Sequence, residues 1–177
     1  AREGLHNPQP VLTTGPRPPK PAAQTYSVNT AGLSWGVPVS AGEIAGRASV
    51  IDGDTIEIAG QRIRLHGIDA PESGQTCRTG SGASVRCGRD AAFALADRVG
   101  SRPVICEVVD VDRYGRSVAV CAQDGEDLNA WMVLEGHALA YQRYSDAYIP
   151  HERAARTRGN GIWAYEFDKP WRWRREN

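Results

Sequence analysis

Residues 50–72 read VIDGDTIEIAGQRIRLHGIDAPE, and this stretch decides the fold. Apolar and polar residues alternate on both sides of Gly60-Gln61, as in two half-buried strands joined by a tight turn. With Gly first in a two-residue loop, we expect a type II′ turn. The register that such a turn sets gives three facing pairs: Ile58 with Ile63, Ile56 with Leu65, and Glu57 with Arg64.

The remaining elements follow from the same periodicities. Alternation predicts five strands, at about residues 44–51, 54–59, 62–67, 103–111 and 116–123. Helical spacing and stop signals predict three helices, at about residues 89–99, 127–135 and 147–158. Five short strands with three helices indicate an α+β protein that is mainly β. The expected architecture is a five-stranded OB-fold barrel with three helices packed against it.

Composition divides the chain into three parts. Residues 1–42 include six of the eleven prolines within the first 21 positions, so we expect a Pro-rich arm that is poorly ordered or docked on the domain surface. The barrel domain is expected at residues 43–167. Residues 168–177 form a tail rich in tryptophan and arginine.

Bulk properties restrict the class of protein. Charged residues make up 24% and hydrophobic residues 41% of the chain, which is ordinary for a globular protein. No apolar run approaches the roughly 18–20 residues that span a bilayer, so we expect no membrane-spanning segment. We also expect a monomer. The net charge is zero, but 19 of the 21 basic residues are arginine, which suits phosphate. A biased genomic composition would give the same ratio.

The four cysteines point to disulfides rather than to zinc. None is spaced as CxxC and the histidines do not cluster near them. The even count is compatible with two disulfides and an oxidising compartment. Separation along the chain suggests the pairs Cys77–Cys87 and Cys106–Cys121. Four free thiols in a cytosolic protein remain the alternative. The chain begins at Ala1 rather than Met, which fits a secreted or periplasmic product after signal-peptide removal, or a trimmed chain.

Acidic residues gather where the predicted hairpin opens. In the expected register Asp54 lies opposite Gly67, two residues before Asp69. Two carboxylates that close need a shared proton or a cation between them. Calcium tolerates an irregular, partly hydrated shell of oxygen ligands, and the backbone carbonyl of Ala70 could join it. The alternative is that Asp-Gly-Asp is only turn-forming sequence and Asp-Ala-Pro-Glu only a strand exit.

Three further side chains complete a candidate site. Glu72 is close enough to deprotonate a water beside the metal ion. Arg64 and Arg116 could neutralise charge that develops on a phosphate. The plainer alternatives are a solvated loop acid for Glu72, a cross-strand salt bridge from Arg64 to Glu57, and a solvated turn residue for Arg116.

Three blocks of the sequence resemble the staphylococcal nuclease family. They are IDGDTIEI with IRLHGIDAPE, then VDRYGRSVAV, then HERAARTRGNGIWAYEF, in the family's order and over residues 44–167. The resemblance implies an OB-fold barrel and calcium-dependent hydrolysis of phosphodiester bonds in DNA and RNA. It also implies roles for single residues, with Asp54, Asp69 and the Ala70 carbonyl as calcium ligands and with Glu72, Arg64 and Arg116 as catalytic groups.

Other positions depart from the family pattern. Position 70 is Ala where the type member has Thr, and Arg113 stands where it has a lysine. Tyr141 and Tyr144 resemble tyrosines that line the nucleotide pocket, although their spacing differs by one residue. The loop CRTGSGASVRC, which holds Cys77 and Cys87, does not match the lysine-rich loop of the type member.

The function that these observations favour is a calcium-dependent nuclease that uses one Ca²⁺ ion and cleaves DNA, RNA or both. A non-catalytic OB-fold module that binds nucleic acid or protein is the alternative, with Tyr141, Tyr144 and the WRWRR segment as contacts. The acids discriminate between them, because a pure binder of polyanions gains nothing from carboxylates that face a phosphate. A family member that serves an envelope process is a third reading.

Overall fold

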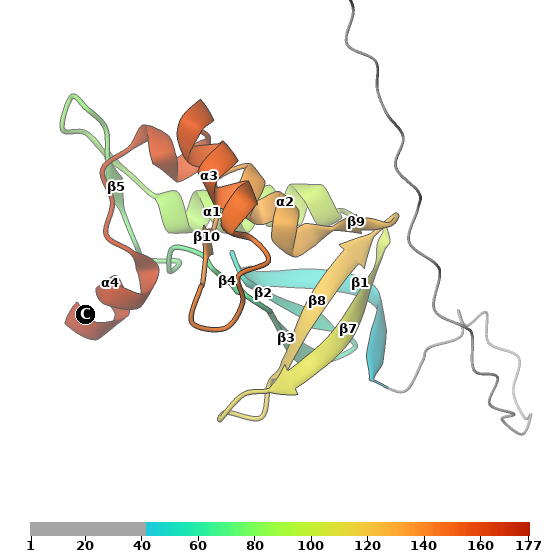
Figure 1. Cartoon of the computed structure of the whole chain (residues 1–177). Coiled ribbons are helices and arrows are strands. Elements are labelled where there is room, and N and C mark those ends of the chain that lie inside the picture. Colours follow the sequence, from blue (N-terminus) through green and yellow to red (C-terminus); the bar gives the residue numbers. More distant parts are fainter. Residues whose placement is uncertain (1–41) are drawn as a thin grey trace, which may run out of the picture. The chain divides into compact units, whose positions relative to one another are not determined.

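The computed structural model describes residues 42–177, and the predicted arm at residues 1–42 lies outside this range apart from its last residue. Five strands form the barrel: β1 (Glu43–Asp52), β2 (Thr55–Ile58), β3 (Gln61–Leu65), β7 (Pro103–Val111) and β8 (Ser117–Gln123). They are ordered β3-β2-β1-β7-β8, and a parallel pairing of β3 with β8 closes the barrel. The other pairings within it are antiparallel. This is the predicted five-stranded OB-fold barrel in an α+β, mainly β, protein (Figure 1).

The β2–β3 hairpin carries the centre of the core but not in the predicted register. Ile56 pairs with Ile63, and Ile58 pairs with Gln61, so the expected pairing was wrong by two residues. The two-residue turn is Ala59-Gly60, both with positive φ, as in a type I′ turn whose twist matches that of the strands. A shift of two residues keeps every side chain on its face. The predicted inward residues are therefore still buried, and they are Ile56, Ile58, Ile63 and Leu65.

Within residues 42–177, four α-helices accompany the barrel, one more than expected. Their bounds are α1 (Cys87–Val99), α2 (Leu128–Leu134), α3 (Ile149–Arg158) and α4 (Pro170–Glu176). Figure 1 shows α1, α2 and α3 gathered beyond one end of the barrel, with α4 apart from them. Helix α1 buries Cys87, Ala91, Leu95 and Val99, a stripe spaced by four residues. The Asp127 side chain caps α2 by accepting a hydrogen bond from the Ala130 amide.

Short pairings and two disulfides complete the domain. The remaining elements are β4 (Ile68–Asp69), β5 (Cys77–Arg78), β6 (Ser84–Val85), β9 (Glu126–Asp127), β10 (Leu139–Ala140) and the 3₁₀ helix η1 (Gly161–Ala164). Strand β4 pairs with β10, and β5 pairs with β6. The expected disulfides Cys77–Cys87 and Cys106–Cys121 are both present. Within residues 42–177, no helix is long and apolar enough to cross a membrane.

Candidate active site

Two buried aspartates converge where β2 begins and β4 ends. Asp54 is 3% exposed and Asp69 is fully buried. The guanidinium of Arg64, on β3, lies between them, with Nη1 2.9 Å from Asp54 Oδ1 and Nη2 2.6 Å from Asp69 Oδ1. The predicted convergence of the two carboxylates is therefore present, although it depends on this shared arginine and not on the register first expected.

Further hydrogen bonds hold Asp54 in place. It accepts from the Thr55 hydroxyl at 3.1 Å and from the Ala70 amide at 3.1 Å. Burial raises the pKa of Asp54 to about 7, with Arg64 acting in the opposite direction and Asp52 and Asp69 adding to the rise. Burial also raises the pKa of Asp69, against the influence of neighbouring arginines. Both carboxylates would be stabilised in their charged form by a cation.

Arg64 does not form the cross-strand salt bridge to Glu57 that was the alternative to a role in the site. In the observed register Glu57 faces Arg62, and the ion pair forms between these two residues at 3.8 Å. Arg64 faces Thr55 instead and turns to the aspartates. Burial tends to lower the pKa of Arg64, but Asp54 and Asp69 outweigh burial and leave the pKa raised.

The loop after β4 presents Glu72 at the edge of this group. Its side chain is 31% exposed, and its backbone carbonyl is packed against Gly88 in the first turn of α1. Gln75, which is fully buried, accepts from the Glu72 amide at 3.2 Å and donates to the Asp168 carbonyl at 2.6 Å. Sequence reasoning missed this glutamine, which connects the Glu72 loop to the segment before α4.

A second guanidinium that the sequence did not reveal reaches the acids from α4. Arg174 donates from Nη1 and Nη2 to the two oxygens of Asp69 at 3.0 and 2.9 Å, and from Nη1 to Glu72 Oε1 at 2.5 Å. Burial acts to lower the pKa of Arg174, but the hydrogen bonds that it donates to Asp69 and Glu72 outweigh burial and leave the pKa raised. The only sequence signal for this contact is the arginine-rich segment itself, which does not say where it docks.

Arg116 lies apart from the acids, at the β7–β8 turn. Its Nε donates to Asp112 Oδ2 at 2.7 Å, and its side chain is 29% exposed. Within the described residues, no hydrogen bond or ion pair joins it to Asp54, Asp69 or Glu72. Burial would raise the pKa of Asp112, but hydrogen bonds from Arg116 and from the Tyr114 amide lower it. The neighbouring Arg113 is exposed and lies over the Tyr114 ring.

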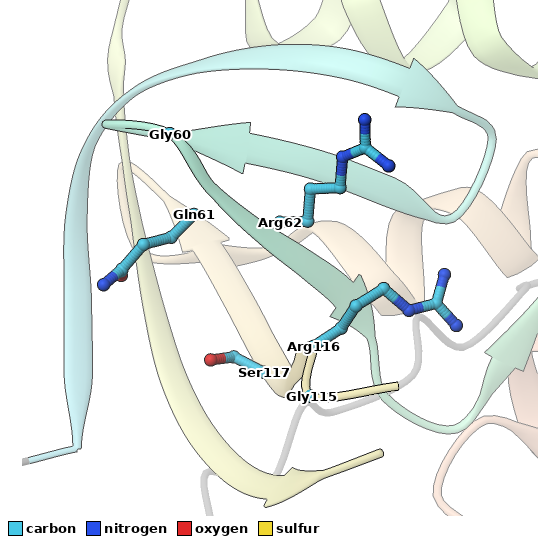
Figure 2. Close-up of a pocket in the computed structure, with 6 residues that line it drawn as sticks. All are labelled: Gly60, Gln61, Arg62, Gly115, Arg116 and Ser117. Carbon is cyan, nitrogen blue, oxygen red and sulfur yellow. The ribbon is translucent and has the colours of Figure 1, made fainter. Parts of the chain in front are cut away.

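A shallow hollow of about 370 Å³ lies between the β2–β3 and β7–β8 turns. Its lining residues are Gly60, Gln61, Arg62, Gly115, Arg116 and Ser117. Figure 2 shows the Arg62 and Arg116 side chains leaving their strands in the same direction, whereas Gln61 and Ser117 point the other way. The hollow includes one predicted site residue, Arg116, and none of the three acids.

The two tyrosines assigned to the substrate lie beyond β10. Tyr141 is half-buried and stacks on Trp171 of α4 with ring centroids 5.2 Å apart. Tyr144 meets the edge of Tyr141 and is 59% exposed. Tyr141 therefore borders α4, and Tyr144 borders Tyr141.

The donor set fits a hard divalent cation that keeps water or substrate oxygens in its shell. Asp54 and Asp69 already hold positively charged groups against their oxygens, and calcium accepts carboxylates, backbone carbonyls and water together. Within residues 42–177, no group of three or more His, Cys, Asp or Glu side chains is arranged to hold a metal ion. Side chains alone would thus leave the shell incomplete, and the Ala70 carbonyl would be needed with water and substrate.

Comparison with known proteins identifies the family of this chain. A family model described as "Staphylococcal nuclease homologue" matches residues 62–165. The chain is 47% identical over 125 residues to "Succinoglycan biosynthesis protein ExoI" of Rhizobium meliloti (strain 1021), with 68% of this chain and 64% of that protein covered. It is 37% identical over 144 residues to "Micrococcal nuclease" of Shigella flexneri, covering 71% and 77% of the two chains. An "Uncharacterized endonuclease" of Escherichia coli O157:H7 is 36% identical over 152 residues, covering 80% and 91%.

Proposed function

We propose that this chain, which belongs to the staphylococcal nuclease family, hydrolyses phosphodiester bonds of DNA, RNA or both in a calcium-dependent reaction. The chain spans just under two thirds of the length of the R. meliloti relative, so the proposal concerns the domain in hand. Two relatives carry nuclease names, which supports the reaction class.

The roles proposed for the residues follow from their chemistry. Asp54, Asp69 and the Ala70 carbonyl would hold the ion. When bound, calcium supplies positive charge against the scissile phosphate and orients a water molecule. Glu72, at the partly exposed edge of the group, accepts a proton from the attacking water. Arg64 and Arg116 stabilise the negative charge that develops on the phosphate oxygens.

The surroundings suggest how substrate and environment enter. Arg113 is proposed to bind a neighbouring phosphate, and Tyr141 and Tyr144 to contact a base. Two disulfides favour an oxidising compartment, so we propose a secreted or periplasmic monomer. The proposed domain is residues 43–167, with residues 168–177 as an appended segment.

The observation that carries the proposal is the pair of buried aspartates, Asp54 and Asp69, held on one guanidinium beside an accessible Glu72. The test incubates the protein with labelled DNA and RNA oligonucleotides in calcium, magnesium, manganese or chelator. We expect cleavage with calcium and none with chelator. Asp69→Asn should abolish it, whereas Asp124→Asn, on an exposed turn, should leave it unchanged.

Two outcomes would contradict the proposal. Equal cleavage in calcium and in chelator would remove the metal from the reaction. Retention of the oligonucleotide without cleavage under every condition would favour the alternative, a non-catalytic OB-fold binding module.

A further inference from the structure

Helix α4 delivers a positively charged side chain to the centre of the candidate site. Arg174 forms three hydrogen bonds with Asp69 and Glu72, although it lies 105 residues from Asp69 along the chain. Neither α4 nor Arg174 has a part in the proposed reaction. The contact therefore needs an explanation of its own.

The atoms that Arg174 binds are those that the reaction needs. Asp69 Oδ1 accepts from both Arg64 and Arg174, and Oδ2 accepts from Arg174. Glu72 Oε1 is also engaged by Arg174, which leaves the carboxylate a poorer acceptor for a proton from water. A guanidinium and a divalent cation cannot share the same carboxylate oxygens without repelling each other.

We propose that α4 is an inhibitory cover, in which the Arg174 guanidinium occupies the carboxylate oxygens of Asp69 and Glu72 and must withdraw before calcium binds. The inference rests on the proposed function. It predicts that the apparent affinity for calcium is reduced by the fraction of molecules in which the cover is in place.

Contacts of the residues that precede Arg174 hold the cover in place. Trp171 stacks on Tyr141 with an interplanar angle of 7°, and Trp173 approaches Gly74 in the Glu72 loop. The segment before the helix is tied to the same loop by the hydrogen bond from Gln75 to the Asp168 carbonyl. These contacts explain how a helix of seven residues can keep one orientation.

The same contacts are few enough for the cover to open. Pro170 is the one buried residue of α4, and the Arg174 side chain is 33% exposed. The ion pairs with Asp69 and Glu72 are therefore partly accessible to water, and a divalent cation brings twice the charge of a guanidinium to the same oxygens. Calcium can compete for the acids while the barrel stays folded.

The test measures calcium binding in the absence of nucleic acid, by calorimetric titration of Ca²⁺ into the full chain. Arg174→Gln removes the guanidinium and should bind calcium about tenfold more tightly than the wild type. Arg172→Gln is the matched control, because Arg172 is on the same helix and pairs with the exposed Glu176. Its affinity should equal that of the wild type. Trp171→Ala, which loosens the helix without touching an acid, should shift the affinity in the same direction as Arg174→Gln.

Cleavage rates then separate a cover from a substrate-binding arginine. At low calcium Arg174→Gln should cut faster than the wild type, and at saturating calcium the two rates should meet. Equal calcium affinities in all the proteins would overturn the cover alone. So would slower cleavage by Arg174→Gln at saturating calcium, because Arg174 would then serve the substrate. No calcium-binding heat in any of them would overturn the proposed calcium chemistry, and the cover with it.

Discussion

Substituting Gly88 by alanine should disturb the candidate site without changing any of its functional groups. Gly88 lies in the first turn of α1, where the backbone of the Glu72 loop crosses it. An added Cβ would lie 1.6 Å from the Glu72 carbonyl oxygen and 2.5 Å from its carbonyl carbon. Both obstructing atoms are backbone, so no side-chain rotation relieves the overlap.

The size of the effect follows from that distance. Real Cβ atoms essentially never approach closer than 3.0 Å, so the helix and the loop must separate by about 1.4 Å. A misplacement of about 1 Å can reduce a catalytic rate by about 10²-fold, and we expect a loss of that order. Overpacking of this kind destabilises by about 1–3 kcal/mol. Because each kcal/mol lowers Tm by about 2–4 °C at this chain length, Tm should fall by several degrees.

Gly80→Ala is the matched control. Gly80 lies in the loop closed by the Cys77–Cys87 disulfide, and a Cβ there would meet nothing within 4 Å. Both variants are compared in calcium-dependent cleavage of a labelled oligonucleotide below their Tm, with circular dichroism to confirm folding. Wild-type cleavage by Gly88→Ala, together with a reduced Tm, would refute the reasoning that cleavage depends on the position of Glu72.

Three further predictions concern the acids and the disulfides. Arg64→Ala should slow cleavage by about 10²–10³-fold, whereas Arg102→Ala, at an exposed position, should leave the rate unchanged. Arg64→Ala should also destabilise the calcium-free protein by about 3 kcal/mol, because two buried carboxylates lose the partner that they share. The pKa of Asp54 is raised from 3.8 to about 7, so between these pH values the folded state holds a proton that the unfolded chain has released. The contribution of Asp54 to the free energy of unfolding therefore falls as pH rises through this window, and calcium should raise Tm more at pH 8 than at pH 5. Removing Cys77–Cys87 by paired serine substitutions should lower the free energy of unfolding by about 3 kcal/mol and speed proteolysis of the C-terminal segment. Removing Cys106–Cys121 in the same way should lower stability without exposing that segment. Thermal denaturation and limited proteolysis measure both effects.

The barrel could be predicted from the sequence because alternation is a local signal. Each strand shows its buried face every second residue, and the two-residue turn between β2 and β3 limits the possible pairings to very few. The register nevertheless came out two residues away, at Ile58 opposite Gln61. Alternation cannot detect a shift of two, because such a shift leaves every side chain on its predicted face. The observed pairing goes with the Ala59-Gly60 turn, in which both residues have positive φ.

In the candidate site too, residues close in sequence could be predicted and contacts between distant residues could not. Asp54, Arg64 and Asp69 lie within 16 positions of one another, so a hairpin and its exit bring them together. Arg174 reaches the site through a contact with Asp69, 105 positions away, and Gln75 connects the Glu72 loop to Asp168, 93 positions from Gln75. No periodicity reports contacts at such separations. The arginine-rich segment at residues 172–175 indicates a positive charge, but the sequence does not indicate which residues it contacts.

The burial of Asp69 connects the stability of this site to its proposed chemistry. A fully buried carboxylate without a positive partner would be strongly destabilising, and Arg64 and Arg174 together supply two guanidinium groups to it. The acids can therefore stay in position before any ion arrives, so calcium has no need to organise the loop. In the proposed reaction, calcium would replace a positive charge that the chain already provides. Because Arg64 comes from a barrel strand and Arg174 from a short appended helix, Arg174 is the partner that can leave at the smaller loss of packing. The affinity for calcium should accordingly depend more on α4 than on the barrel.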